Sequence, residues 1–150
     1  MKGFFFRLER ILRLRSRAER EQTQVFGQAL RAEQARREAL EQAAARLERC
    51  EDQVSDALDS ACPAGELRNL GLVMEAANRV VDSAARSHRD AVDRVQIEQD
   101  LLGRARMERR VVERLREKRH ETWARETSRE EQSEMDGVAR GRWRKGGKSS

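Results

Sequence analysis

The sequence contains little of the material from which a globular core is usually built. Its 150 residues include a single proline and no tyrosine, and aromatic residues make up 4% of the chain whereas charged residues make up 39%. A composition dominated by Ala, Arg, Glu, Leu and Gln is typical of long helices and coiled coils. High charge with few aromatics also accompanies disorder, but disordered chains rarely keep a regular apolar repeat. The spacing of the apolar residues therefore decides between the two.

Cysteine and histidine are also scarce. The only cysteines, Cys50 and Cys62, do not make a disulfide framework, and we interpret them as small hydrophobic residues in a reducing compartment. Neither His88 nor His120 has a Cys or carboxylate neighbour at metal-ligand spacing, and the C-terminal KGGKSS is not a phosphate-binding loop. We predict no catalytic, cofactor-binding or metal-binding residues, and a protein that is not an enzyme.

Long apolar runs are missing as well. After MKGFFF the apolar residues are interrupted by Arg7, Arg10 and Arg13, so no stretch of signal-peptide or membrane-spanning length is formed. The expected location is the cytoplasm.

A regular apolar repeat is present between residues 67 and 112. Steps of three and four residues from Leu67 give a series in which eleven of fourteen members are apolar, and most of the residues between them are charged or polar. The series is Leu67, Leu70, Met74, Ala77, Val81, Ala84, His88, Ala91, Val95, Glu98, Leu102, Ala105, Arg109 and Val112. This is the a/d pattern of a coiled-coil helix, which needs a partner helix of similar length.

A second apolar stripe precedes the only proline, Pro63. We expect it to include Phe4, Leu8, Ile11, Leu14, Ala18, Val25, Ala29, Ala32, Leu40, Ala43, Leu47, Cys50, Val54, Leu58 and Ala61. Pro63 and Gly65 separate the two stripes and indicate a reversal of the chain. The predicted fold class is all-α, an antiparallel two-helix coiled-coil hairpin over 1–137. We place its helices at 4–61 and 66–136, the turn at 62–65, and a disordered basic tail at 138–150.

Folding the chain about residue 64 gives a testable register. It pairs Leu40 with His88 and brings Phe4 and Phe5 to Trp123. The alternative left open is an intermolecular coiled coil, in which each stripe pairs with its own copy.

The two ends that this register brings together are basic. Residues 1–20 hold seven basic and two acidic side chains, and residues 104–119 hold eight basic and three acidic ones. Such a zone favours an acidic partner, and nucleic acid or an anionic membrane is possible on electrostatics alone. The aromatic residues are too few for a single-strand nucleic-acid platform, so nucleic acid is the less favoured of these partners.

The chain ends resemble those of a known family. An opening FFFRLERILRLRSRAEREQ and a closing EKRHETWARETSREEQSEMDGVARGRWR resemble the flagellar type III export protein family FliJ, which is related to the YscO-like injectisome proteins. Phe5, Leu8 and Leu12 fit the family's first motif. The residues that fit its second motif are Glu131, Met135, Asp136, Ala139 and Arg142. Gly137 stands where the family usually has an acidic residue.

The resemblance implies a cytoplasmic protein of the flagellar export apparatus, peripherally associated with the inner face of the cell membrane and needed for motility. It implies a stalk or adaptor that docks into the export ATPase ring, promotes its activity, contacts the export gate membrane protein and escorts export chaperones. The YscO-like injectisome role is the alternative. The residues that we predict to bind partners are Phe4, Phe5, Leu8, Arg10, Ile11, Arg13, Arg15, Arg109, Arg110, Arg116 and Trp123.

Overall fold

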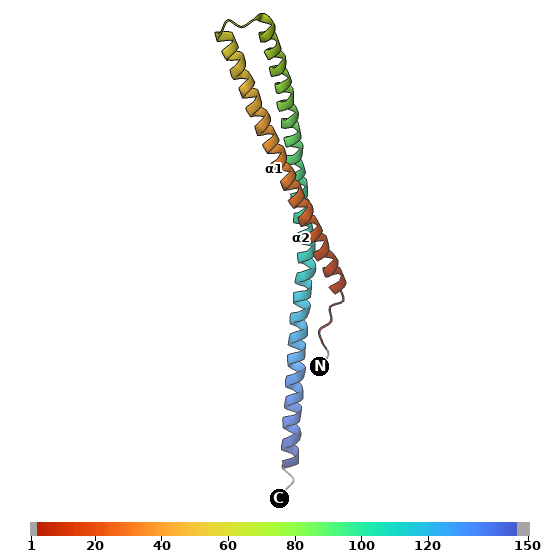
Figure 1. The fold of residues 1–150 in the computed structure, drawn as a ribbon. Coiled ribbons are helices and arrows are strands. Elements are labelled where there is room, and N and C mark those ends of the chain that lie inside the picture. Colours follow the sequence, from red (N-terminus) through yellow and green to blue (C-terminus); the bar gives the residue numbers. More distant parts are fainter. Residues whose placement is uncertain (1–2, 147–150) are drawn as a thin grey trace. The chain divides into compact units, whose positions relative to one another are not determined.

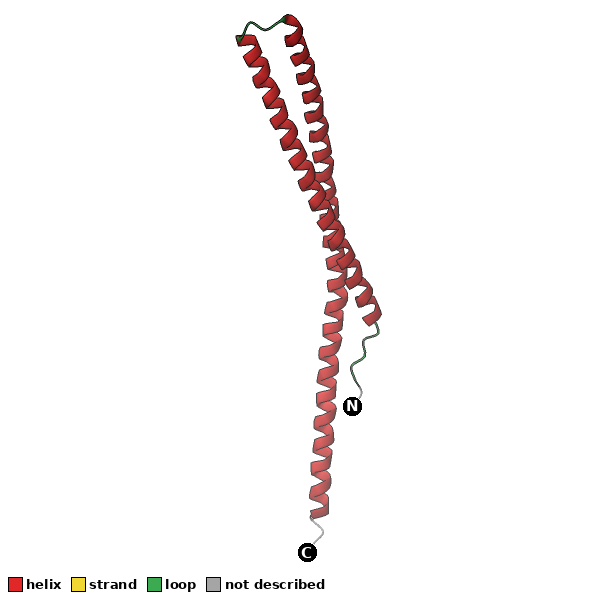
Figure 2. Cartoon of the chain, in the orientation of Figure 1, coloured by secondary structure: helices red, strands yellow, loops and turns green. Residues whose placement is uncertain are grey.

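A computed structural model describes residues 3–146, and the surroundings of side chains for residues 3–140. Within this range the chain forms two helices and no strand (Figures 1 and 2), so the all-α prediction is confirmed. Helix α1 spans Glu9–Asp59 (51 residues) and helix α2 spans Ala64–Gly146 (83 residues). Over the described residues, neither helix has an apolar stretch long enough to cross a membrane.

The chain divides into two compact units, and both helices contribute to each of them. Unit 1 combines Met1–Glu19 with Ala105–Ser150, and unit 2 is the continuous stretch Arg20–Arg104. Unit 2 holds the turn and the helical segments on either side of it, which run antiparallel (Figure 1). Unit 1 holds the N-terminal segment and the C-terminal part of α2. Each unit is described by itself below.

The turn between the helices occupies residues 60–63, slightly earlier than the predicted 62–65. Helix α1 ends where the Ser60 hydroxyl and amide both donate to the Asp56 carbonyl oxygen, at 3.0 and 3.1 Å. Pro63, which has no amide hydrogen to donate, directly precedes α2, and its carbonyl oxygen accepts from the amides of Glu66 and Leu67. Gly65 lies inside α2, and no described residue has a positive φ.

Helix α1 begins at Glu9 rather than at residue 4. The preceding phenylalanine segment is not helical, although the Glu9 amide donates to the Phe6 carbonyl oxygen at 3.1 Å. Phe6 is only 8% exposed in this conformation. Burying an aromatic ring stabilises the fold by more than the helix propensity of these residues would. Side-chain packing therefore determines the backbone conformation of this segment.

Helix α2 continues to Gly146, beyond the predicted end at residue 136. Gly137 does not end it, because one glycine costs a helix only about 1 kcal/mol and the surrounding residues are good helix formers. The basic tail that we predicted from residue 138 therefore starts no earlier than 147 in this structure, and residues 147–150 lie outside the described range. The side chain of Trp143 also lies outside it.

The predicted seam of α2 is confirmed along its full length. Every one of the fourteen residues in the Leu67-to-Val112 series is at least half-buried, and Glu98 and Leu102 are each only 3% exposed. Most residues between them are exposed. The three- and four-residue steps in the sequence therefore identify the face of α2 that packs against α1.

The stripe predicted for α1 is correct from Leu40 to Val54 and fails at several positions on either side of that stretch. Within unit 2 the half-buried or buried face of α1 includes Gln22, Phe26, Ala29, Glu33, Leu40, Ala43, Leu47, Cys50, Val54 and Ala57. Val25 and Leu58, which we predicted to be in the stripe, are 36% and 65% exposed. The prediction failed because polar residues occupy several seam positions, where an apolar pattern cannot find them.

The predicted register of unit 2 also needs correction. Nε2 of His88 lies 2.9 Å from Oε1 of Glu33, seven residues before the predicted partner Leu40. Because the turn lies earlier than residue 64, the α2 residues of unit 2 meet a more N-terminal part of α1, as the Gln22–Glu98 hydrogen bond also shows. The seam is also thin, in the sense that few apolar side chains are fully buried. Among the described residues, the buried apolar ones are Phe6, Ala29, Ala43 and Leu102.

Candidate docking site in unit 1

The N-terminal segment of unit 1 packs on α2 through aromatic rings. The Phe4 ring meets the His120 ring edge-on with centroids 5.0 Å apart, and its centroid is 5.8 Å from that of Trp123. His120 and Trp123 are themselves 5.7 Å apart. The predicted approach of Phe4 to Trp123 is therefore confirmed. These rings hold an extended segment against a helix, where backbone hydrogen bonds within the segment are few.

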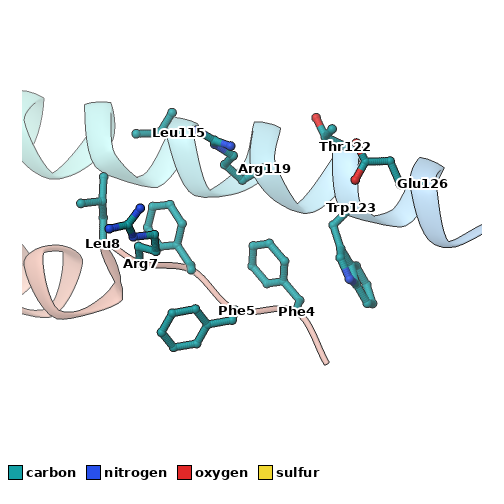
Figure 3. Close-up of a pocket in the computed structure, with 10 residues that line it drawn as sticks. Phe4, Phe5, Arg7, Leu8, Leu115, Arg119, Thr122, Trp123 and Glu126 are labelled. Carbon is teal, nitrogen blue, oxygen red and sulfur yellow. The ribbon is translucent and has the colours of Figure 1, made fainter. Parts of the chain in front are cut away.

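A shallow groove opens between this segment and α2 (Figure 3). Phe5 is 83% exposed and points away from α2, whereas Leu8 and Leu115 line the groove on the left of the view. The groove is lined by Phe4, Phe5, Phe6, Arg7, Leu8, Leu115, Arg119, Thr122, Trp123 and Glu126. Apolar walls with a cationic group on each side can receive an apolar side chain that has acidic neighbours.

Among the described residues, four ion pairs join α1 to α2 in this unit, and in one of them Nε of Arg106 lies 3.7 Å from Oε1 of Glu19. Arg109 binds both Glu19 of α1 and Glu113 of α2, the second at 2.7 Å. Arg116 is 3.1 Å from Glu9, and Arg15 pairs with Glu108. The hydrogen bond that Arg109 donates to the Glu19 carboxylate raises the pKa of Arg109, and the negative charge of the same carboxylate raises it further. These arginines hold the helices together.

Three exposed arginines of the unit have no such partner among the described residues. Arg10, Arg13 and Arg110 are exposed, and none has a carboxylate of the described residues at ion-pair distance. Their charge is therefore available to a binding partner. Exposed cations of this kind raise the rate of association with an acidic surface and discriminate against basic ones.

All eleven residues predicted to bind partners fall within unit 1. They divide into three groups by their surroundings. Phe4, Leu8 and Trp123 are half-buried between the segment and α2; Arg15, Arg109 and Arg116 are in ion pairs; and Phe5, Arg10, Ile11, Arg13 and Arg110 are exposed and unpaired. The structure thus brings the two distant sequence segments together, and their contact with partners stays a prediction.

Several participants escaped the sequence analysis. His120 was not predicted to be a contact residue, but its ring meets those of Phe4 and Trp123. The carboxylates of Glu9, Glu19 and Glu108 were not singled out, because a repeat of apolar residues does not identify charged pairs that cross a seam.

Among the described residues, no group of three or more His, Cys, Asp or Glu side chains could hold a metal ion. His88 is half-buried in the seam of unit 2 and bonded to Glu33, as expected for a structural histidine. What unit 1 presents is a surface with apolar and cationic groups.

The comparison with protein families gives a match over nearly the whole chain. The family model described as Flagellar FliJ protein matches residues 4–148. The searches of curated proteins and of solved structures returned no match. The match includes both segments of unit 1 and all of unit 2, so it does not rest on one helix. The chain belongs to the flagellar FliJ protein family.

Proposed function

We propose that this protein docks through unit 1 into the ring of the flagellar export ATPase and promotes its activity. Membership of the FliJ family indicates a non-enzymatic role related to flagellar export. In the finer proposal, the protein also contacts the export gate membrane protein and escorts export chaperones, from the cytoplasmic side of the membrane. The flagellar family match favours this role over the injectisome alternative.

One observation carries the proposal. Unit 1 gathers exposed aromatic and aliphatic side chains with arginines that have no carboxylate partner among the described residues. Phe5 and Ile11 are 83% and 42% exposed, and Arg10, Arg13 and Arg110 are free to pair. Aromatic and arginine residues are the types most enriched at the energetic centres of protein interfaces. A docking surface of this composition suits a protein partner with acidic groups.

The experiment is to measure ATP hydrolysis by the cognate export ATPase with and without the full chain. Stimulation by the wild type, and its loss in a variant carrying Phe5→Ala, Arg10→Glu and Arg13→Glu, would support the proposal. The matched control carries Arg46→Glu and Arg68→Glu, two exposed arginines of unit 2. This control changes the net charge to the same degree and should stimulate the ATPase as the wild type does.

The result that would remove the proposal is a chain that neither stimulates the ATPase nor elutes with it on gel filtration. Equal losses in the two variants would point to net charge in place of a specific surface. Binding to DNA that falls steeply with salt, without any effect on the ATPase, would favour the nucleic-acid alternative.

A further inference from the structure

The N-terminal segment of unit 1 has the side-chain alternation of an extended strand. Phe6 is buried and Phe4 packs on the rings of His120 and Trp123, whereas Phe5 between them is exposed. Successive side chains of an extended chain point to opposite faces, and the backbone N–H and C=O groups point sideways between them. Because Phe4 faces α2, the backbone groups of this segment are directed along the surface of that helix.

The backbone of this segment is nearly free of hydrogen bonds. Among the described residues, the hydrogen bond that involves the backbone of residues 3–6 runs from the Glu9 amide to the Phe6 carbonyl oxygen. An extended chain with open backbone groups can pair with a second extended chain, in the way that a peptide adds to the edge of a sheet. A helix cannot pair in this way, because its backbone groups are already bonded within it.

The groove of Figure 3 lies between this segment and α2 and has the length of a short extended peptide. Its lining on α2 runs from Leu115 to Glu126, which corresponds to about 16 Å at the rise per residue of an α-helix. An extended chain covers that length with about five residues. The groove therefore fits a short peptide segment in extended conformation.

The lining of the groove combines aliphatic walls with two cations. Leu8 and Leu115 contribute the aliphatic surface. Arg7 comes from the N-terminal segment and Arg119 from α2, and neither has a carboxylate of the described residues at ion-pair distance. Among the described residues of the lining, Glu126 is the one that is acidic. The groove is therefore complementary to a ligand that is both apolar and negatively charged.

We propose that this groove binds a short acidic peptide segment of a partner protein in extended conformation. The peptide pairs with the backbone of residues 3–6, packs one large apolar side chain against Leu8 and Leu115, and presents carboxylates to Arg7 and Arg119. A second copy of this chain fits less well. Its acidic residues between 48 and 59 lie within α1, and its own extended segment leads into arginines.

This inference rests on the proposed function, since it names the chemistry of the partner segment that unit 1 receives. The first probe is a labelled peptide of about seven residues with leucine at its centre and aspartate elsewhere, a length and composition that do not hold a helix. A second probe replaces every aspartate with lysine. Fluorescence anisotropy measures the binding of each to the full chain at physiological salt. We expect the aspartate peptide to bind at least about tenfold more tightly than the lysine peptide.

Backbone pairing is tested with two N-methylated versions of the aspartate peptide. In each version alternate amides are methylated, so that one edge of the extended chain or the other cannot donate hydrogen bonds. Because one edge faces residues 3–6, we expect one version to lose about tenfold in affinity and the other to lose less than about threefold.

The emission of Trp123 reports binding at this groove, because the indole lines it. In a Trp143→Phe background, the aspartate peptide should change the emission of Trp123 in a saturable manner. The same titration with the lysine peptide should leave the emission unchanged.

The variant for the groove is Arg7→Gln with Arg119→Gln, for which we expect the aspartate peptide to lose about tenfold or more in affinity. The matched control is Arg49→Gln with Arg114→Gln. It removes the same charge at exposed positions that do not line the groove, and it should change the affinity by less than about threefold. Circular dichroism checks that both double variants keep their helices.

Four outcomes would overturn the inference. They are equal binding of the aspartate and lysine peptides, equal affinities of the two N-methylated versions, equal losses in the two double variants, and binding that leaves the emission of Trp123 unchanged. Failure of the proposed function has a different signature, in which the aspartate peptide binds in the groove while the export ATPase neither binds nor responds.

Discussion

His88 and Glu33 meet inside the seam of unit 2, with Nε2 of the imidazole 2.9 Å from Oε1 of the carboxylate. The same oxygen accepts from Arg37 at 2.7 Å. The side chains of His88 and Glu33 are 23% and 12% exposed, so this polar contact lies where the neighbouring layers are apolar. A polar layer in a coiled coil fixes the register of the helices at some cost in stability.

The Glu33 carboxylate makes unit 2 sensitive to acid. Hydrogen bonds from Arg37 and then His88 hold the pKa of Glu33 below its ordinary value of 4.5. Because the folded pKa is the lower one, this stabilisation is present above about pH 4.5 and is lost as the pH falls through the folded value. Thermal melts from pH 6 to pH 3 should show the midpoint of Glu33→Gln approaching that of the wild type in acid. The exposed Glu48→Gln should show a constant difference.

Replacing the whole polar layer should stabilise the helices while loosening their register. In the double variant Glu33→Leu with His88→Leu, apolar contact takes the place of a desolvated polar pair, so we expect a higher melting temperature than in the wild type. The single variant His88→Leu should melt lower than the double variant, because it leaves Glu33 in the seam with fewer partners. Disulfide trapping between cysteines placed on the two helices would reveal additional registers in the double variant. A lower melting temperature of the double variant would contradict this account.

Two adjacent leucines test the seam of α2. Leu102 is 3% exposed and Leu101 is 41% exposed. Leu102→Ala should reduce the free energy of unfolding by about 2 kcal/mol, toward the low end for buried leucines because a thin seam can partly collapse. Leu101→Ala should change it by less than about 0.5 kcal/mol. Urea unfolding followed by circular dichroism measures the free energy of unfolding of both variants. Equal effects would argue against the assignment of Leu102, and not Leu101, to the face of α2 that packs against α1.

The thiol of Cys62 should react slowly for a residue in a turn. Partial burial is the main cause that raises its pKa above 9.0, and the neighbouring Glu66 raises it further. Less thiolate is then present at pH 8, and alkylation by iodoacetamide is slowed. In a Cys50→Ser background, the variant Glu66→Gln should react faster than the parent. A rate that is unchanged by this substitution would contradict the contact.

The packing of the N-terminal segment can be followed through Trp123. In a Trp143→Phe background, Phe4→Ala removes a ring whose centroid is 5.8 Å from that of Trp123. The emission of Trp123 should shift to the red and become more accessible to iodide, with a loss of about 1 kcal/mol in stability. Phe5→Ala is the control, since this ring is exposed. Similar spectra for the two variants would place Phe4 away from α2.

The sequence predicted α2 better than α1 for a physical reason. The α2 seam is apolar at eleven of fourteen positions, so its period could be read without knowing its partner. In α1 the seam contains Gln22 and Glu33, while Val25 is exposed. A stripe drawn through the apolar residues alone therefore falls on the wrong face of α1 in that stretch. Only the partner residues on α2 explain why polar groups are buried at those positions.

The sequence identified the two segments that form the candidate site, but it did not identify the residue contacts between them. The basic and aromatic residues indicated the two segments that form the candidate site, and Phe4 does meet Trp123. The ion pairs of Glu9 and Glu19 with α2 join charged residues, which the apolar pattern does not identify. In unit 2 the earlier turn changes the pairing, so that His88 meets Glu33 in place of Leu40.

The thinness of the seam has a consequence for the lifetime of the protein in the cell. Phe6, Ala29, Ala43 and Leu102 are the only buried apolar residues among those described, so little free energy separates the paired helices from open ones. A partner that binds only the paired form would protect it from proteolysis by mass action. The proposed docking to the export ATPase then predicts that pulse-chase labelling shows faster turnover of this protein when the ATPase is deleted, so that its amount follows that of its binding partner.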